Sequence, residues 1–220
     1  FDRPIIARHT TAYWNRLGPR MNAFKNHHLK VMLLRPGSTD LDEQGRITGS
    51  LDVPLSGPGK QQVQQLTAKM PAVTVDRIYS APGSAALQTL RELPQFNGLK
   101  VRVEESLSNV NHGLWHGKQI VELQQNQPKL FRQWQENPEM VHLPDGELIE
   151  DVRVRVNRLI RQIERKQKSG KVLIVAPEPV AGIILSELEG TELQTYWQTH
   201  GRFAEWTWVR YKRDELAVAR

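Results

Sequence analysis

An uninterrupted apolar run at residues 172–175, directly after an amphipathic segment, constrains the fold more than any other feature of the sequence. The amphipathic segment begins at Asp151, and its apolar residues from Val152 to Ile163 follow spacings of 4, 3, 1 and 3. These spacings predict a helix that buries one face. The basic residues and glycine at 166–170 are typical of a helix end. A wholly apolar run after such a helix is typical of a strand at the centre of a parallel sheet.

The same alternation of strand and helix extends along most of the chain. Ser56 and Pro58 favour the start of a helix that buries Val63, Leu66 and Met70. Further strands are predicted at residues 31–34, 77–80, 100–103 and 206–211, and further helices at residues 12–17, 118–137 and 180–188. Strands that alternate with helices predict a three-layer α/β/α sandwich with a mostly parallel central sheet.

The amino-terminal segment differs from the rest of the chain in charge. Residues 1–30 hold six arginine and lysine residues but one aspartate, so most of the net charge of +6 lies there. We therefore predict a basic extension or linker at residues 1–29, with a solvated His27-His28 pair, and one domain at residues 30–220. Because the chain begins with Phe1, we expect a fragment or processed product that an upstream domain could precede.

Composition excludes several kinds of protein. Cysteine is absent, which rules out disulfides, thiolate metal sites and a cysteine nucleophile. No apolar run is long enough for a membrane-spanning helix, and the first ten residues lack the apolar core of a signal peptide. We predict a cytoplasmic protein. Outside the extension the charge is nearly balanced, which does not indicate a nucleic-acid-binding face, although the extension itself could recruit anionic polymers or membranes.

The predicted parallel strands place their following loops at one edge of the sheet, where ligands bind in such folds. Residues 35–37, 80–82 and 176–178 follow three of these strands. If the chain has a site, we expect these three loops to form it.

These loops and neighbouring segments resemble the histidine phosphatase (phosphoglycerate mutase-like) superfamily, in the family's order, from about residue 31 to 186. Near the start, residues 35–39 resemble the family motif R-H-G-E-T, residues 45–49 resemble G-R-x-x-G and residues 51–55 resemble L-D-x-P-L. Residues 79–82 resemble Y-S-S-P and residues 113–117 resemble G-x-W-E-G. Residues 144–147 resemble P-G-G-E, and residues 172–179 resemble V-L-V-V-S-H-G-G. The resemblance implies the phosphoglycerate mutase-like version of the predicted fold.

The resemblance also implies a mechanism. In the family, a histidine after the first strand attacks phosphorus, two arginines and a second histidine hold the phosphoryl oxygens, and a carboxyl group protonates the leaving oxygen. Matched motif by motif, these roles fall on positions that cannot perform them: Pro36 for the nucleophile, Pro177 for the second histidine, Ala85 for the second arginine and Asn109 for the proton donor. Of the central group Arg35 remains, either as a residual anion contact or as a structural ion-pair partner.

Charge in the predicted site changes as well. Glu178 stands where the family has a glycine, and Asp42 lies in the first loop. A phosphate dianion would meet like charges at these carboxylates. Prolines at the strand ends stiffen the loops, so we expect a rigid surface there.

These observations led us to predict a catalytically inactive pseudoenzyme with a binding, scaffolding or regulatory role. Its expected partner is an unidentified protein or an upstream domain, and we expect no cofactor and no metal. The alternative is a divergent phosphatase or mutase-like enzyme that acts on phosphoesters through a non-standard nucleophile such as His112 or His116. These two histidines are four residues apart, as metal ligands on a helix would be, but Gly113 and Gly117 predict a turn.

Overall fold

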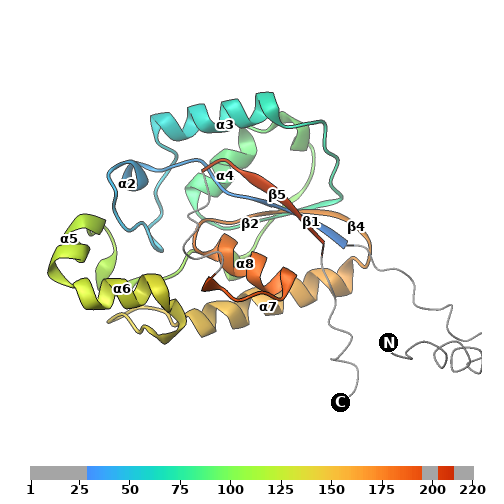
Figure 1. The fold of residues 1–220 in the computed structure, drawn as a ribbon. Helices are drawn as coiled ribbons and strands as arrows, with labels where there is room; N and C mark the ends of the chain where they lie inside the picture. The colour runs from blue at the N-terminus through green and yellow to red at the C-terminus, as the bar shows by residue number, and fades with distance from the viewer. Residues whose placement is uncertain (1–28, 195–202, 211–220) are drawn as a thin grey trace, which may run out of the picture.

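One mixed five-stranded sheet organises the protein, of which the computed structural model describes residues 29–194 and 203–210 (Figure 1). The strand order is β3-β2-β4-β1-β5. In chain order the strands are β1 Leu29–Leu34, β2 Arg77–Ser80, β3 Val101–Val103, β4 Gly170–Val175 and β5 Trp206–Arg210. All neighbouring pairs are parallel except β1 and β5, which are antiparallel. The prediction of a mostly parallel sheet is confirmed.

Helices cover both faces of this sheet. They are α2 Asp40–Glu43, α3 Gly57–Lys69, α4 Ser84–Arg91, α5 Ile120–Asn126, α6 Pro128–Glu136, α7 Ile149–Lys166 and α8 Val180–Glu189. In Figure 1, α3 and α4 lie on one side of the sheet and α7 and α8 on the other, which gives the predicted three-layer arrangement. The elements α2, α5 and α6 lie together at the end toward which β1 leads.

The apolar run at residues 172–175 lies in β4, the central strand. Each of these side chains is at most 1% exposed, and β4 pairs with β1 on one side and β2 on the other. Removing such side chains from water contributes roughly 1.5–3 kcal/mol for each large aliphatic residue. Strand β4 is therefore the hydrophobic centre of the fold, as its apolar run predicted.

Two helices follow the predicted local rules. Ser56 caps α3 by accepting a hydrogen bond from the Gly59 backbone N–H at 2.9 Å, and Pro58 lies in the first turn. Helix α7 begins two residues earlier than predicted, at Ile149, and buries the predicted apolar stripe. The buried residues of α7 are Ile149, Val152, Val156, Leu159, Ile160 and Ile163.

The single helix predicted at residues 118–137 is wrong. The segment forms two helices, α5 and α6, which meet at Gln127 and Pro128. Proline has no backbone N–H and its ring clashes with the preceding turn, so Pro128 ends one helix and starts another. Leu123 and Phe131 from the two helices pack with Trp115 in a small second core that also contains Ile47, Val141 and Leu143.

Several predictions concern residues outside the described ranges. These are the short helix at residues 12–17, the His27-His28 pair and the end of the last strand at Tyr211. The boundary between a basic extension and the domain, placed before residue 30, also remains a prediction. Within the described ranges, no helix combines the length and apolar character needed to cross a membrane.

Two valines on α7 provide a test of this packing. Val156 is fully buried, whereas Val154 on the same helix is 49% exposed. We expect Val156→Ala to lower the free energy of unfolding by about 2 kcal/mol, because it removes two buried methyl groups and leaves a cavity. Val154→Ala should change it by less than about 0.5 kcal/mol, since alanine favours the helix and little burial is lost. Urea denaturation checks the pair, and equal effects would contradict the packing described.

Candidate active site

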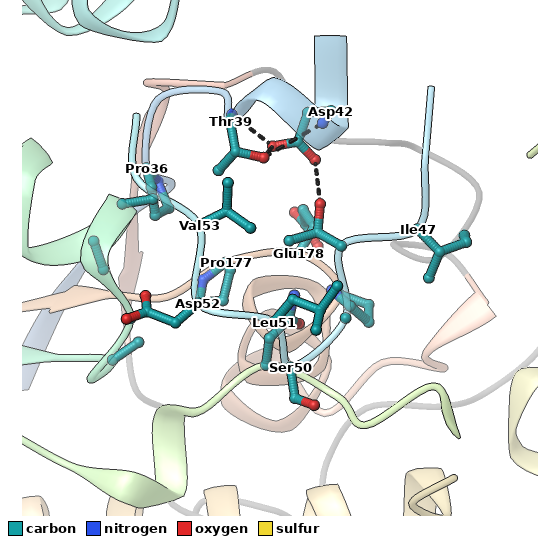
Figure 2. Close-up of a pocket in the computed structure, with 18 of the residues that line it drawn as sticks. Pro36, Thr39, Asp42, Ile47, Ser50, Leu51, Asp52, Val53, Pro177 and Glu178 are labelled. Carbon is teal, nitrogen blue, oxygen red and sulfur yellow. Dashed lines mark hydrogen bonds between the residues drawn. The ribbon is translucent and has the colours of Figure 1, made fainter. Parts of the chain in front are cut away.

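A pocket of about 640 Å³ opens at the carboxyl ends of β1, β2 and β4 (Figure 2). The three loops that follow these strands all contribute to its lining, as predicted. The pocket also has a wall that we did not predict, the loop at residues 45–53. The structure brings every predicted site residue into this one pocket, namely Arg35, Pro36, Ala85, Asn109 and Pro177. That they have lost the family's catalytic roles remains a prediction.

Arg35 is held by an ion pair at the edge of the pocket. Its Nε–H donates to Oε1 of Glu178, and the other oxygen of Glu178 accepts from the Gly182 backbone N–H at 3.2 Å. Arg35 is only 8% exposed. Its two Nη groups make no hydrogen bond to another described residue. Arg35 therefore forms its ion pair through Nε.

The other predicted carboxylate, Asp42, has a structural role beside the pocket. It accepts hydrogen bonds from the Thr39 backbone N–H at 2.8 Å, the Thr39 hydroxyl at 2.7 Å and the Thr48 hydroxyl at 3.1 Å (Figure 2). Together with Thr39 it forms the capping box of α2. These bonds satisfy the carboxylate without neutralising its charge.

Asp52 is a further carboxylate in the lining that the sequence analysis missed. Its oxygens accept from the Ser84 backbone N–H at 2.6 Å and the Ser84 hydroxyl at 3.0 Å. Asp52 thus satisfies an N–H in the first turn of α4, where a negative charge is stabilised. The family motif at residues 51–55 contained this residue, but spacing alone did not show that it reaches another loop.

Carboxylates outnumber arginines in the pocket. The lining contains Asp42, Asp52, Glu105 and Glu178 but only two arginines. The second arginine, Arg46, donates from Nη1 to the Gly117 carbonyl at 2.6 Å. The lining therefore contains two more carboxylates than arginines.

His112 is the residue of the pocket whose hydrogen-bonding capacity is unused. Its side chain is buried, with the residue 4% exposed, and neither ring nitrogen has a hydrogen-bond partner. Its ring meets that of Trp134 edge to face, with 5.6 Å between the centroids. Both residues line the pocket. A buried polar ring without partners is uncommon and is typical of a group kept for a ligand or for chemistry.

The surroundings of His112 keep its imidazole neutral. Burial, followed by the nearby His116, lowers the pKa of His112 to about 4 from its ordinary value of 6.5. The Val110 carbonyl and the Glu147 carboxylate oppose this shift, although the carbonyl does not reach hydrogen-bond geometry. At neutral pH the ring therefore carries an unprotonated nitrogen with a lone pair.

His116 is arranged differently. Its Nε2 accepts from the His112 backbone N–H at 3.0 Å and from the Ser50 backbone N–H at 3.2 Å, which implies that the proton lies on Nδ1. Partial burial lowers its pKa. Gly49 lies so close that a Cβ there would come within 2.3 Å of the His116 ring. His116 thus joins the 45–53 loop to the turn that carries His112, and its acceptor nitrogen is already occupied.

The turn between the two histidines is the one predicted from its glycines. Residues Gly113–Trp115 form a single 3₁₀ turn, and both Gly113 and Gly117 have positive φ.

Across residues 29–194 and 203–210, no three histidine, aspartate or glutamate side chains are grouped so that they could hold a metal ion.

Comparison with known proteins establishes the family. The model of the histidine phosphatase superfamily (branch 1) matches residues 31–220, so the chain belongs to this superfamily. It is 28% identical over 169 residues to phosphoserine phosphatase 1 of Hydrogenobacter thermophilus, covering 77% of the chain and 80% of that protein. It is 24% identical to the Escherichia coli protein named "Probable phosphoglycerate mutase GpmB", covering 74% of the chain and 75% of that protein. The α-ribazole phosphatase of Shigella flexneri has the same fold, with a TM-score of 0.70 and 23% identity over 81% of this chain and 89% of that one.

These relatives contradict our prediction that the chain is not an enzyme. They carry the names of phosphatases and of a mutase, and they point to an enzyme rather than a pseudoenzyme. The prediction was drawn from the residue types at the matched motif positions alone. The fold also brings His112 from another loop into the same pocket.

The buried His112 predicts a specific pH dependence of stability. Because folding lowers its pKa, the unfolded chain binds more protons, so the stability gained is complete above pH 6.5 and is lost as the pH falls toward 4. Between pH 7 and pH 5 this group alone should cost about 2 kcal/mol. Urea denaturation at both pH values should show the loss shrinking by about that amount in His112→Asn. The exposed His142→Asn is the control and should keep the wild-type loss; an unchanged loss in His112→Asn would refute the assignment.

Proposed function

We propose that this protein is a divergent phosphoesterase of the histidine phosphatase superfamily in which His112 is the nucleophile. The observation that carries the proposal is the His112 ring, which lines the pocket, lacks any hydrogen-bond partner and is neutral at neutral pH. A neutral imidazole nitrogen offers the electron pair that Pro36 lacks. The relatives named phosphoserine phosphatase and phosphoglycerate mutase support a phosphoester as the substrate.

His116 is the weaker of the two candidate nucleophiles. Its Nε2 lone pair already accepts two backbone N–H groups, and its ring is not part of the pocket lining. Attack by His116 would break both hydrogen bonds and move the 45–53 loop. We therefore assign His116 a positioning role: it orients the backbone of His112 and the loop opposite.

The proposed reaction has two steps. Both imidazole nitrogens of His112 are buried in this structure, so the ring must turn or its cover must shift before one of them meets the substrate. That nitrogen then attacks phosphorus, the bond between phosphorus and the alcohol oxygen breaks, and the departing oxygen takes a proton from water. Water then attacks the phosphohistidine, which breaks the N–P bond, releases inorganic phosphate and restores the neutral imidazole. The Nη groups of Arg35 would contact the phosphoryl oxygens and stabilise their charge.

An assay with 4-nitrophenyl phosphate tests the nucleophile. We expect measurable turnover by the wild type and a loss of at least about 100-fold in kcat in His112→Asn. Removing the nucleophile of an enzyme usually lowers kcat by more than this factor. The exposed His142→Asn is the matched control and should retain full activity. Acid quenching during turnover should trap an acid-labile phosphohistidine that is absent from His112→Asn. Turnover that survives His112→Asn, or wild-type activity no higher than that of a mock purification, would refute the proposal.

The amide at position 109, where the family has a proton donor, leads to a second prediction. Asn109 has no ionisable proton, so the leaving oxygen departs with most of its negative charge. We expect kcat/KM to fall steeply as the pKa of the leaving alcohol rises, by more than about tenfold between 4-nitrophenyl and phenyl phosphate. Asn109→Glu should raise the rate for phenyl phosphate more than for 4-nitrophenyl phosphate. A flat dependence on the leaving group would show that another residue donates the proton.

A further inference from the structure

The carboxylates of the pocket suggest which phosphoesters it accepts. Asp42, Asp52 and Glu105 line the pocket, and none of them forms a salt bridge within the described part of the chain. Their hydrogen bonds come from neutral groups: those of Asp42 from threonines, and those of Asp52 and Glu105 from serines. Three negative charges therefore face the same space without a paired cation.

The same space contains an unused polar group and apolar walls. The His112 ring is buried and has no partner, which marks the pocket as a ligand site independently of its acidity. Ile47 and Val53 also line the pocket, and two apolar side chains remain partly exposed in the lining, Leu51 at 44% and Phe203 at 45%. An apolar ligand group could pack against such side chains.

On this basis we infer that the pocket selects phosphoesters whose alcohol part carries a positively charged nitrogen on an apolar body. The inference rests on the proposed function and specifies its substrate class. A simple phosphomonoester dianion brings two negative charges to a lining in which four carboxylates already outnumber two arginines. A zwitterionic phosphoester has a smaller net charge, and its cation can be placed near the unpaired carboxylates. The aromatic face of Phe203 or Trp134 would add a cation–π contact.

Two isosteric substrates provide the test, choline phosphate and 3,3-dimethylbutyl phosphate. They have the same shape, but one has a quaternary nitrogen where the other has carbon. We expect kcat/KM to be at least about tenfold higher for choline phosphate at low ionic strength, and the ratio to shrink as salt is added. Because the positive charge also makes choline the better leaving group, the part of the ratio that salt removes is the part assigned to the carboxylates. Equal kcat/KM values, or a preference for the neutral ester, would overturn the inference.

A pair of neighbouring glutamates provides the matched variants. Glu105 lines the pocket and its neighbour Glu104 does not. Glu105→Gln keeps the size of the side chain and can still accept from Ser108, so it should reduce the preference for choline phosphate about threefold. Glu104→Gln should leave the preference unchanged. An equal effect of both variants would show that the preference reflects only the overall charge of the protein.

Binding of the dephosphorylated compounds separates this inference from the proposed function. Choline and 3,3-dimethylbutanol can be titrated against the full chain by NMR without any turnover. Preferential binding of choline by a chain that hydrolyses neither ester nor 4-nitrophenyl phosphate would refute the proposed function and support the cation preference. Hydrolysis of both esters at equal rates, with no preference in binding, would support the function and refute the inference.

Discussion

The parallel register of β1, β4 and β2 is the constraint on which the rest of the molecule depends. Leu34 pairs with Val175, and Val175 in turn pairs with Ser80, so the three strands end side by side. Their following loops are consequently brought to one edge by the backbone hydrogen bonds of the sheet, and the Arg35–Glu178 ion pair then joins two of them. The position of the pocket is therefore set by the sheet behind it.

Burial is what distinguishes the two histidines of the 112–117 turn. His116 uses its acceptor nitrogen on two backbone N–H groups, and this contact fixes the turn against the 45–53 loop. The same contact holds His112 in place through its backbone N–H. The ring of His112 lies beside Trp134, and its nitrogens have no hydrogen-bond partner. His116 thus positions His112. The imidazole of His112 is neutral at neutral pH because burial, and then the neighbouring His116 ring, lower its pKa. The two roles are set by the turn rather than by residue type.

Much of the fold was predictable from local pattern, because strands and helices with one buried face carry their periodicity in the sequence. The apolar run in β4, the stripe of α7 and the Ser56 cap are all examples. Site residues that follow strand ends, such as Arg35, Pro36 and Pro177, were predictable from the order of the strands, and Ala85 and Asn109 from the family motifs. Asp52, Glu105 and the approach of His112 depend on loops that meet across more than 30 residues of sequence, and no local pattern encodes such contacts. The enzyme prediction failed because it was drawn from the residue types at motif positions alone.

A nucleophile with so low a pKa shifts the balance between the two proposed steps. A weakly basic imidazole stays unprotonated over the whole physiological range, but its lone pair is less nucleophilic than that of an ordinary histidine. The same weak basicity makes it a better leaving group when water attacks the phosphohistidine. Under the proposed mechanism, formation of the intermediate would be slower than its hydrolysis, because Asn109 cannot protonate the departing alcohol. The phosphohistidine can build up only when the leaving group is good enough to accelerate the first step, so the chemistry of the pocket itself selects aryl phosphates as the substrates with which the intermediate can be trapped.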